Sequence, residues 1–253
     1  MTDRIKATDK QDMLYGIRPL LEAIDSGKEI EKVFLQKGLR SENFSELMNQ
    51  LKKIDIPYQF VPIEKLNRLT RKNHQGVVAY VSPIVFDNIE QIIPVVFEQG
   101  KEPFVLLLDR ITDVRNFGAI LRTAECTGVH AVVIPTKNSA QLNSGTIKSS
   151  AGAIFKVPIC RSENLKHTID FLMNSGLKIV AATERADDVH YNTDLSGPLA
   201  LILGSEDEGI SGEYLKRASQ TVKIPILGEI DSLNVSVAAG VLMYEVVRQR
   251  DIK

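Results

Sequence analysis

The sequence predicts an α/β protein of two domains, in which a small N-terminal α/β domain precedes a larger domain built on a parallel sheet. In the second part of the chain, short apolar runs alternate with helical patterns. Strands that are apolar on both faces and separated by helices are typical of a parallel sheet covered on both sides. Pro83, Pro94 and Pro103 bracket the stretch before this region, so the 253-residue chain is predicted to divide there.

The first domain is predicted over residues 11–82. Amphipathic periodicity indicates its helices, and β-branched and aromatic residues indicate its strands. The expected elements are, in order, a helix at 14–24, a strand at 33–35, a helix at 43–54, a strand at 58–61, a basic helix at 64–72 and a strand at 77–81. Together they predict a compact α/β unit.

Residues 83–100 are predicted to form a linker and lead-in, within which residues 88–98 fit one helix. The second domain is predicted over residues 101–253. Its expected strands are the apolar runs at 104–108, 131–134, 177–181, 199–203 and 222–226.

The composition excludes several classes of protein. The hydrophobic fraction of 43% and the charged fraction of 25% are those of a globular protein. The net charge of −1 gives no global basic field, so a nucleic acid would have to meet local basic patches. Cys126 and Cys160 are too few for a disulfide framework and have no zinc-ligand spacing, so no metal is expected. Without an apolar signal region or a run of about 20 apolar residues, the protein is predicted to be cytoplasmic and to have no membrane partner.

Common nucleotide and hydrolase motifs do not occur in the sequence. No G-x-G-x-x-G follows a strand, no G-x-x-x-x-G-K-[ST] is present, and the four histidines form no H-E-x-x-H. There is also no G-x-S-x-G. Dinucleotide binding, nucleoside triphosphate hydrolysis, zinc proteolysis and serine hydrolysis are therefore not predicted.

The first of three segments with candidate chemistry is LLLDRITDVRNFGAILRTAECTGVHAVVIP, residues 106–135. Asn116 lies where a helix is expected to begin, and by position alone it fits an N-cap. Arg122, further along that helix, fits a solvated charge near Glu125. Because ligands bind at the carboxyl ends of parallel strands, both residues are also candidates for a binding site.

The second segment, LALILGSEDEGIS at residues 199–211, runs from a buried strand into a glycine and an acidic loop. Gly204 fits equally a tight turn and a place where a ligand approaches the backbone. The adjacent carboxylates of Glu206, Asp207 and Glu208 fit an exposed loop, or a loop that faces a cation such as a sulfonium or an arginine.

The third segment, IPILGEIDSLNVSVAAGVLMYEVVRQR at residues 224–250, reads as a strand, a loop and a long apolar helix. Either Ser232 or Asn234 is suited to cap this helix, because both side chains accept a hydrogen bond from a free backbone N–H.

These three segments carry a resemblance to a known family. N-x-G-A-x-x-R-T-A, L-G-S-E-x-E-G-I and S-L-N-V-S-V-A resemble, in order and spacing, the three signature motifs of the SpoU/TrmH (SPOUT) family of RNA 2′-O-ribose methyltransferases. YGI near the start and HQGVVA before residue 80 resemble the N-terminal substrate-binding domain of the same family. With TKNSAQLN at 136–143, the chain most resembles the RlmB branch, which methylates a guanosine ribose in bacterial 23S ribosomal RNA.

The resemblance implies a fold, a cofactor and partners that no periodicity indicates. The second domain is expected to contain a deep trefoil knot, to bind S-adenosyl-L-methionine and to form a homodimer. The first domain is expected to be ribosomal-protein-like and to bind RNA, with Arg68, Arg71 and Lys72 as candidate contacts.

The resemblance also implies roles for individual residues. Arg122 is expected nearest the reacting ribose hydroxyl, as a base or, because a guanidinium has a pKa above about 12, as a clamp on the adjacent phosphate. The residues expected to orient Arg122, the donor or the ribose are Asn116, Glu206, Ser232 and Asn234. Those expected to bind the cofactor are Gly204, Ile224 and Leu233.

Three alternatives remain open at this point: methylation of transfer RNA, a non-catalytic RNA-binding or ribosome-assembly role on the same fold, and methylation of a small molecule. The last predicts that residues 1–82 are dispensable.

Overall fold

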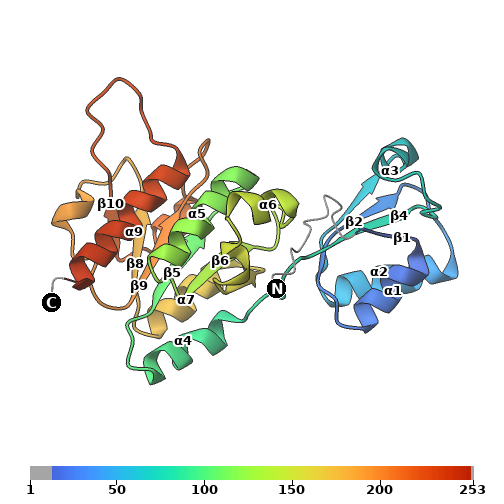
Figure 1. The fold of residues 1–253 in the computed structure, drawn as a ribbon, viewed down its shortest axis with the longest axis horizontal. Coiled ribbons are helices and arrows are strands. Elements are labelled where there is room, and N and C mark those ends of the chain that lie inside the picture. The colour runs from blue at the N-terminus through green and yellow to red at the C-terminus, as the bar shows by residue number, and fades with distance from the viewer. Residues whose placement is uncertain (1–12, 252–253) are drawn as a thin grey trace, which may run out of the picture. The chain divides into compact units, whose positions relative to one another are not determined.

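The computed structural model describes residues 13–251, so the predicted outer limits at residues 11 and 253 lie outside the described residues. The chain forms two compact units (Figure 1). Unit 1 runs up to Val85 and includes Leu142–Ser144, and unit 2 comprises Phe86–Gln141 and the chain from Gly145 onward. The predicted linker at 83–100 differs from this division, because a helix within it belongs to the core of unit 2, as described below.

Unit 1 is a four-stranded sheet in the order β1-β4-β2-β3, with helices on it. Its elements are β1 (Met13–Tyr15), α1 (Ile17–Asp25), β2 (Ile30–Gln36), α2 (Glu42–Lys53), β3 (Tyr58–Val61), α3 (Ile63–Leu69) and β4 (Val77–Val81). β4 is antiparallel to β1 and β2, whereas β2 and β3 are parallel. Alternate side chains separate the two faces: Val33 and Leu35 pack with α1 and α2, while Phe34 packs with Leu66 of α3.

The beginning of unit 1 differs from the prediction. Leu14, expected in the first helix, lies in β1 opposite Ala79. Gly16, with φ of +96°, separates this strand from α1, so the helix begins only at Ile17. The amphipathic pattern that predicted a single helix therefore covers part of a strand, a turn at Gly16 and a helix. Glycine makes this turn because it adopts a positive φ at little steric cost. The strand expected at 33–35 is longer, and the helix expected at 64–72 ends at Leu69.

Unit 2 confirms the predicted α/β fold with a parallel sheet. Six parallel strands lie in the order β10-β8-β9-β5-β6-β7. The elements are α4 (Ile89–Glu98), β5 (Phe104–Leu108), α5 (Val114–Cys126), β6 (Ala131–Pro135), α6 (Ser144–Ser149), the 3-10 turn η1 (Ala153–Phe155), β7 (Ile159–Ser162), α7 (Leu165–Asn174), β8 (Lys178–Ala182), η2 (His190–Asn192), β9 (Leu199–Leu203), α8 (Gly212–Leu215), β10 (Gln220–Val222) and α9 (Val235–Asp251).

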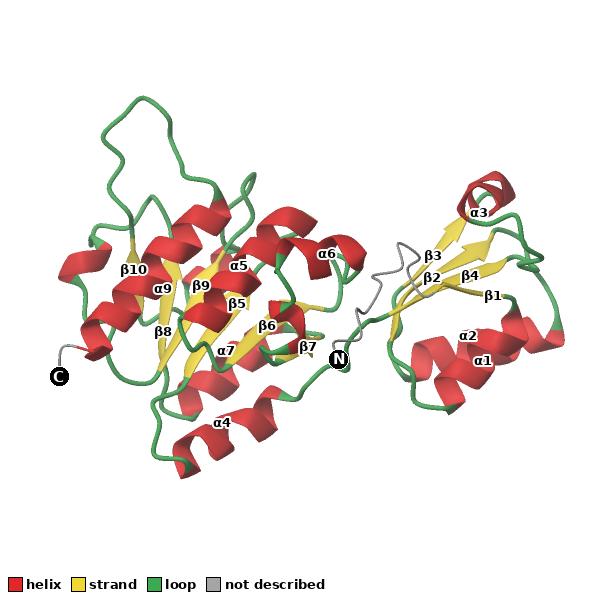
Figure 2. Cartoon of the chain, viewed as in Figure 1, coloured by secondary structure: helices red, strands yellow, loops and turns green. Residues whose placement is uncertain are grey.

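Helices cover both faces of this sheet, which is why its central strands are apolar throughout. α5 and α9 lie side by side over one face, and α4 and α7 cover the other (Figures 1 and 2). Ile89 and Ile93 of α4 join the same buried cluster as Val105 of β5 and Ile169 of α7. Residues 86–98 thus belong structurally to unit 2.

Two strands of unit 2 differ from the prediction. β7 was not predicted, because its four residues, ICRS, are too short and too polar for an apolar run. The strand expected at 222–226 is instead β10, which ends at Val222. Ile224 and Ile226 therefore lie in the loop that leads to α9, where their side chains are available to line a cavity.

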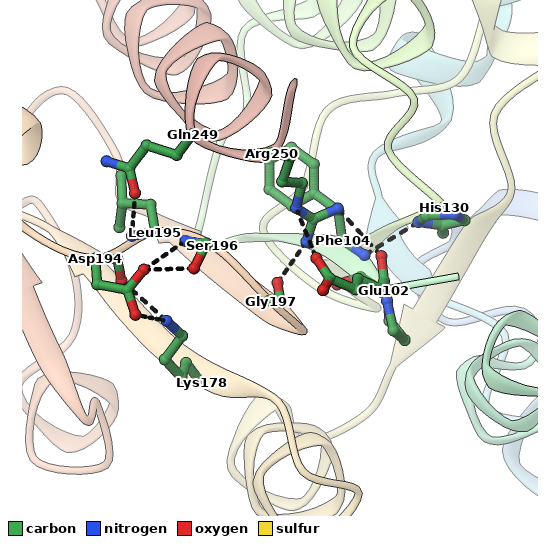
Figure 3. A network of polar contacts seen from close by, with 11 residues as sticks. Glu102, Phe104, His130, Lys178, Asp194, Leu195, Ser196, Gly197, Gln249 and Arg250 are labelled. Atoms are coloured by element: carbon green, nitrogen blue, oxygen red, sulfur yellow. Dashed lines mark hydrogen bonds and ion pairs between the residues drawn. The ribbon is translucent and has the colours of Figure 1, made fainter. Parts of the chain in front are cut away.

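The C-terminal end of α9 is tied to the amino-terminal ends of β5 and β9 (Figure 3). The Arg250 guanidinium donates hydrogen bonds to the carbonyl oxygens of Glu102 (3.1 Å), Pro103 (3.1 Å) and Gly197 (2.6 Å) and lies over the Phe104 ring. His130 Nδ1 accepts a hydrogen bond from the Phe104 N–H at 3.0 Å, and burial, followed by the nearby Arg250 charge, lowers the pKa of His130. This network holds the last helix against the sheet.

Arg250→Ala is expected to lower the free energy of unfolding by roughly 3 kcal/mol, because it leaves three part-buried carbonyls without a charged donor. Urea unfolding of the full chain measures this loss. Arg185→Ala is the matched control: its side chain is 89% exposed and pairs with the exposed Glu184, so about 1 kcal/mol or less should be lost. Equal losses in the two variants would contradict a clamping role for Arg250.

Within residues 13–251, no helix has the length and apolar character that crossing a membrane requires. The same part of the chain contains no group of three or more His, Cys, Asp or Glu side chains arranged to hold a metal ion.

Candidate functional site

The three motif segments meet at the carboxyl ends of the strands of unit 2. β5 and β9 are adjacent and parallel, so the loops that follow them leave the sheet at the same edge. Asn234 Nδ2, just before α9, donates to Asn116 Oδ1 at 3.0 Å and to Glu206 Oε1 at 2.7 Å. The Val235 N–H also donates to Glu206 Oε1, at 3.3 Å. The Asn234 side chain thus contacts two residues that lie 118 and 28 positions before it in the sequence.

The caps of the two helices explain why these side chains take these positions. Asn234 Oδ1 accepts hydrogen bonds from the backbone N–H and hydroxyl of Ser236, so Asn234 rather than Ser232 caps α9. Asp113 caps α5, accepting from the N–H groups of Arg115 and Asn116 at 2.8 Å. The capping role considered for Asn116 is therefore wrong, and its side-chain amide is directed to Asn234 instead.

The acidic loop after β9 is held by an arginine of the loop after β5. Arg110 donates to Asp109 and to the carbonyl of Gly209, and it forms an ion pair with Glu208. Asp109 is 2% exposed and also accepts a hydrogen bond from the Ser211 N–H at 2.8 Å. The hydrogen bond with Asp109 is the largest cause of the raised pKa of Arg110. The sequence allowed this loop to face a cation such as a sulfonium or an arginine. Within the chain, the cation that Glu208 pairs with is Arg110.

Gly204 is required by the close approach of the chain to itself. A Cβ at this position would lie 2.1 Å from the carbonyl carbon of Gly209 and 2.3 Å from the nitrogen of Ile210. Ser205 and Gly209 face each other in an isolated antiparallel bridge, and the Gly209 N–H donates to the Ser205 carbonyl at 3.0 Å. The loop therefore closes tightly directly after β9, and no side chain fits at Gly204.

Two cavities adjoin this junction. The first, of about 460 Å³, is lined by Arg110, Ile111, Thr112, Asp113, Asn116, Asn138, Ser205, Glu206, Asp207, Glu208 and Val235. The second, of about 300 Å³, is lined by Ala182, Thr183, Glu184, Arg185, Leu203, Gly204, Ser205, Glu206, Asp207, Glu208, Gly209, Val222, Lys223, Ile224, Ile226, Asp231, Ser232, Leu233, Val235, Ala238 and Leu242. Residues 205–208 line both, so the acidic loop is a shared wall between them.

Most of the residues predicted for the site lie here. Gly204, Ile224 and Leu233, expected at the cofactor, line the second cavity together with Ser232. Asn116 lines the first cavity, and the Asn234 side chain donates hydrogen bonds to both Asn116 and Glu206. Arg122 is not brought to the junction: its side chain is exposed on α5 and lines neither of these two cavities.

The sequence reasoning missed Arg110 and Asp113. Both lie between β5 and α5, so the rule that polar residues in strand-end loops form sites would have selected them. Arg110 also has a φ of +58°, a left-handed backbone conformation that is uncommon for a residue other than glycine. No pattern in the sequence signals that conformation.

Comparison with known proteins agrees with this architecture. Residues 103–244 match the SpoU rRNA Methylase family, and residues 13–85 match the RNA 2′-O ribose methyltransferase substrate-binding family. A TrmH family tRNA/rRNA methyltransferase of Staphylococcus aureus is 38% identical over 239 residues, covering 94% of this chain and 96% of the relative. The corresponding protein of Bacillus subtilis, YacO, is 33% identical over 244 residues, covering 96% and 98%.

A solved structure has the same fold. The SpoU methyltransferase AviRb of Streptomyces viridochromogenes, in complex with the cofactor AdoMet, aligns with a TM-score of 0.61 and 27% identity, covering 95% of this chain and 91% of that one. The motifs, the parallel sheet with its strand-end junction and the two family matches lead to one assignment. This chain belongs to the SpoU family of methyltransferases, with an N-terminal domain of the family's substrate-binding type.

Proposed function

We propose that this protein transfers a methyl group from S-adenosyl-L-methionine to the ribose 2′-oxygen of a guanosine in 23S ribosomal RNA. The observation that carries the proposal is the junction of Asn116, Glu206 and Asn234, which adjoins a cavity lined by Gly204, Ile224 and Leu233. RNA 2′-O-methylation follows from the family. The guanosine and the ribosomal target rest on the resemblance to the RlmB branch.

The second cavity fits the donor by its chemistry. Leu203, Ile224 and Leu233 give it apolar walls that exclude water from a nucleoside, and Gly204 also lies in its lining. Asp207 and Asp231 add carboxylates, which favour a positively charged ligand. When bound, S-adenosylmethionine supplies an electrophilic methyl group on a cationic sulfur.

The protein side of the reaction is mainly positioning. Holding the ribose hydroxyl in line with the methyl group can lower the barrier by up to roughly 7 to 11 kcal/mol, whereas a general base contributes roughly 10²- to 10⁴-fold. Asn234 fixes Asn116 and Glu206 relative to each other at the wall between the two cavities. In our proposal this wall orients the ribose, with Ser232 at the edge of the donor cavity.

Arg122 enters the proposal through a second copy of the chain. Val237, Val241 and Tyr244 form an exposed apolar stripe on α9, with exposed fractions of 52%, 37% and 56%. Such a stripe at helical spacing favours burial against another protein surface. α5, which carries Arg122, packs along α9. In a homodimer formed through this surface, Arg122 of one copy would reach the junction of the other and hold the phosphate beside the reacting ribose.

The remaining features are predictions of the same proposal. The loops after β9 and β10 are expected to form the trefoil knot of the family, and a ribosomal substrate implies a cytoplasmic location. Because the curated relatives are named for both tRNA and rRNA, transfer RNA is the second candidate substrate.

Two measurements test the function. Calorimetry with S-adenosylmethionine is expected to show donor binding to the isolated protein, and a map of 2′-O-methylation in a deletion strain is expected to lack one guanosine methyl group of 23S ribosomal RNA. Loss of a transfer RNA methyl group instead would move the assignment to the second candidate. Full activity on RNA after deletion of residues 1–82 would contradict the RNA-binding role of the N-terminal domain.

A further inference from the structure

One face of unit 1 holds lysine side chains over aromatic rings. In the sheet, Tyr80 of β4 pairs with Met13 of β1 and with Lys32 of β2. Two residues earlier in β4, Val78 pairs with Tyr15 of β1 and with Phe34 of β2. Because alternate residues of a strand share a face, these six side chains lie on the face opposite the one that packs with α1 and α2. We call it the lysine face.

Three lysines reach this face from different elements. The ammonium groups of Lys32 and Lys65 lie 5.1 Å and 5.0 Å from the centroid of the Phe34 ring, so they can be no further apart than about 10 Å, the sum of these two distances. Lys72, after α3, lies 4.9 Å from the Tyr15 ring and donates to its hydroxyl at 2.9 Å. Cation–π contact restrains each of these flexible side chains in one region.

Within the described residues, these ammonium groups lie against aromatic rings and not against carboxylates. Among residues 13–251, none of the three lysines forms an ion pair with a carboxylate. Cations held close together without counter-charges attract a polyanion, and restraining them beforehand reduces the ordering cost of binding. Arg68 and Arg71, on and after α3, are exposed nearby in the sequence and add positive charge.

We infer that the lysine face binds the phosphodiester backbone of the substrate RNA, with Lys32 and Lys65 as its central contacts and Lys72 beside them. The inference rests on the proposed function, since it takes RNA as the substrate. It also selects among the basic residues of unit 1: Lys52 and Lys53, in the last turn of α2, lie on the helix that packs against the opposite face and have no part in it.

The test measures binding to an unmodified 23S ribosomal RNA transcript over a range of salt concentrations. In Lys32→Gln/Lys65→Gln, glutamine keeps much of the aliphatic stem and removes the charge. We expect the Kd at low salt to rise roughly tenfold and the slope of log K against log salt to fall by about 1.4, since each phosphate contact contributes about 0.7 for single strands. Lys32→Arg/Lys65→Arg keeps the charges and is expected to bind as the wild type does.

Lys52→Gln/Lys53→Gln is the matched control, because it removes the same charge from exposed positions on the other side of the sheet. Its Kd and salt slope are expected to stay within twofold of the wild type, in line with charges that touch no phosphate. Equal weakening in the control and the test variant, or wild-type affinity in both, would overturn the inference. If the Lys32/Lys65 variant does not fold, Lys72→Gln alone decides: an unchanged salt slope would reject the lysine face.

Failure of this inference can be distinguished from failure of the proposed function. Methyl transfer from S-adenosylmethionine to the same transcript is measured with the wild-type protein. Methylation together with binding that is insensitive to the lysine variants rejects the lysine face alone. Lysine-dependent binding without methylation supports the face and rejects the proposed activity.

Discussion

Gly204→Ala is expected to remove donor binding and to reduce methyl transfer at least about 100-fold, since a displacement of about 1 Å at a reacting centre can cost that much. The added Cβ would overlap the backbone of Gly209 and Ile210, which lie 2.1 and 2.3 Å away. Backbone atoms held in the Ser205–Gly209 bridge have no alternative position, so the acidic loop must open. Overpacking of this kind also costs about 1 to 3 kcal/mol of stability.

Calorimetry with S-adenosylmethionine and a methyl-transfer assay measure these effects, with Gly212→Ala as the matched control. Gly212 begins α8, and a Cβ there meets no atom within 4 Å. The control variant is therefore expected to bind the donor and turn over as the wild type does. Wild-type donor affinity in Gly204→Ala would show that the cavity beside β9 is not the donor site.

Arg122→Ala is expected to abolish turnover, with a loss of at least about 100-fold, while donor affinity stays nearly unchanged. Donor binding is spared because Arg122 does not line the 300 Å³ cavity. Loss of turnover follows from the proposed clamp on the phosphate beside the ribose. Single-turnover methyl transfer and calorimetry separate the two effects, and normal turnover in this variant would remove Arg122 from the mechanism.

A mixed dimer tests whether Arg122 acts on the partner copy. Asn234→Asp keeps an acceptor for the α9 cap but places a carboxylate against Glu206, so it should inactivate the site of its own chain. Purified mixed dimers of Arg122→Ala and Asn234→Asp would contain one complete site of two and are expected to recover up to about half of the wild-type activity. No recovery in mixed dimers would contradict a site shared between copies.

Strand prediction succeeded where burial dictates the residue type. The bounds of β5 and β9 match the apolar runs, because a strand covered on both faces must be apolar at every position. β7 escaped prediction, since at the sheet edge it carries Arg161 within four residues. The start of α1 was placed too early, because only the conformation of Gly16 separates it from β1.

The candidate site was predicted from motifs and local rules, and its geometry was not. A cap such as Asn234 depends on neighbours a few residues away, so the sequence is sufficient to predict it. Asn116 fitted the same rule, yet Asp113 takes that role. The side-chain amide of Asn116 instead accepts a hydrogen bond from Asn234, 118 residues further along the chain.

By itself, the sequence predicted the parallel sheet and the residue types at the strand ends, because these depend on composition and periodicity along the chain. Its three motifs carried the resemblance to the family. Tertiary structure alone decided which of those residues meet. The strand order places β9 beside β5, and the hydrogen bonds of Asn234, at 2.7 and 3.0 Å, result from that adjacency. Strand order depends on how the whole sheet packs, and no local pattern encodes it. The same packing leaves Arg122 exposed on α5, away from the two cavities of its own chain.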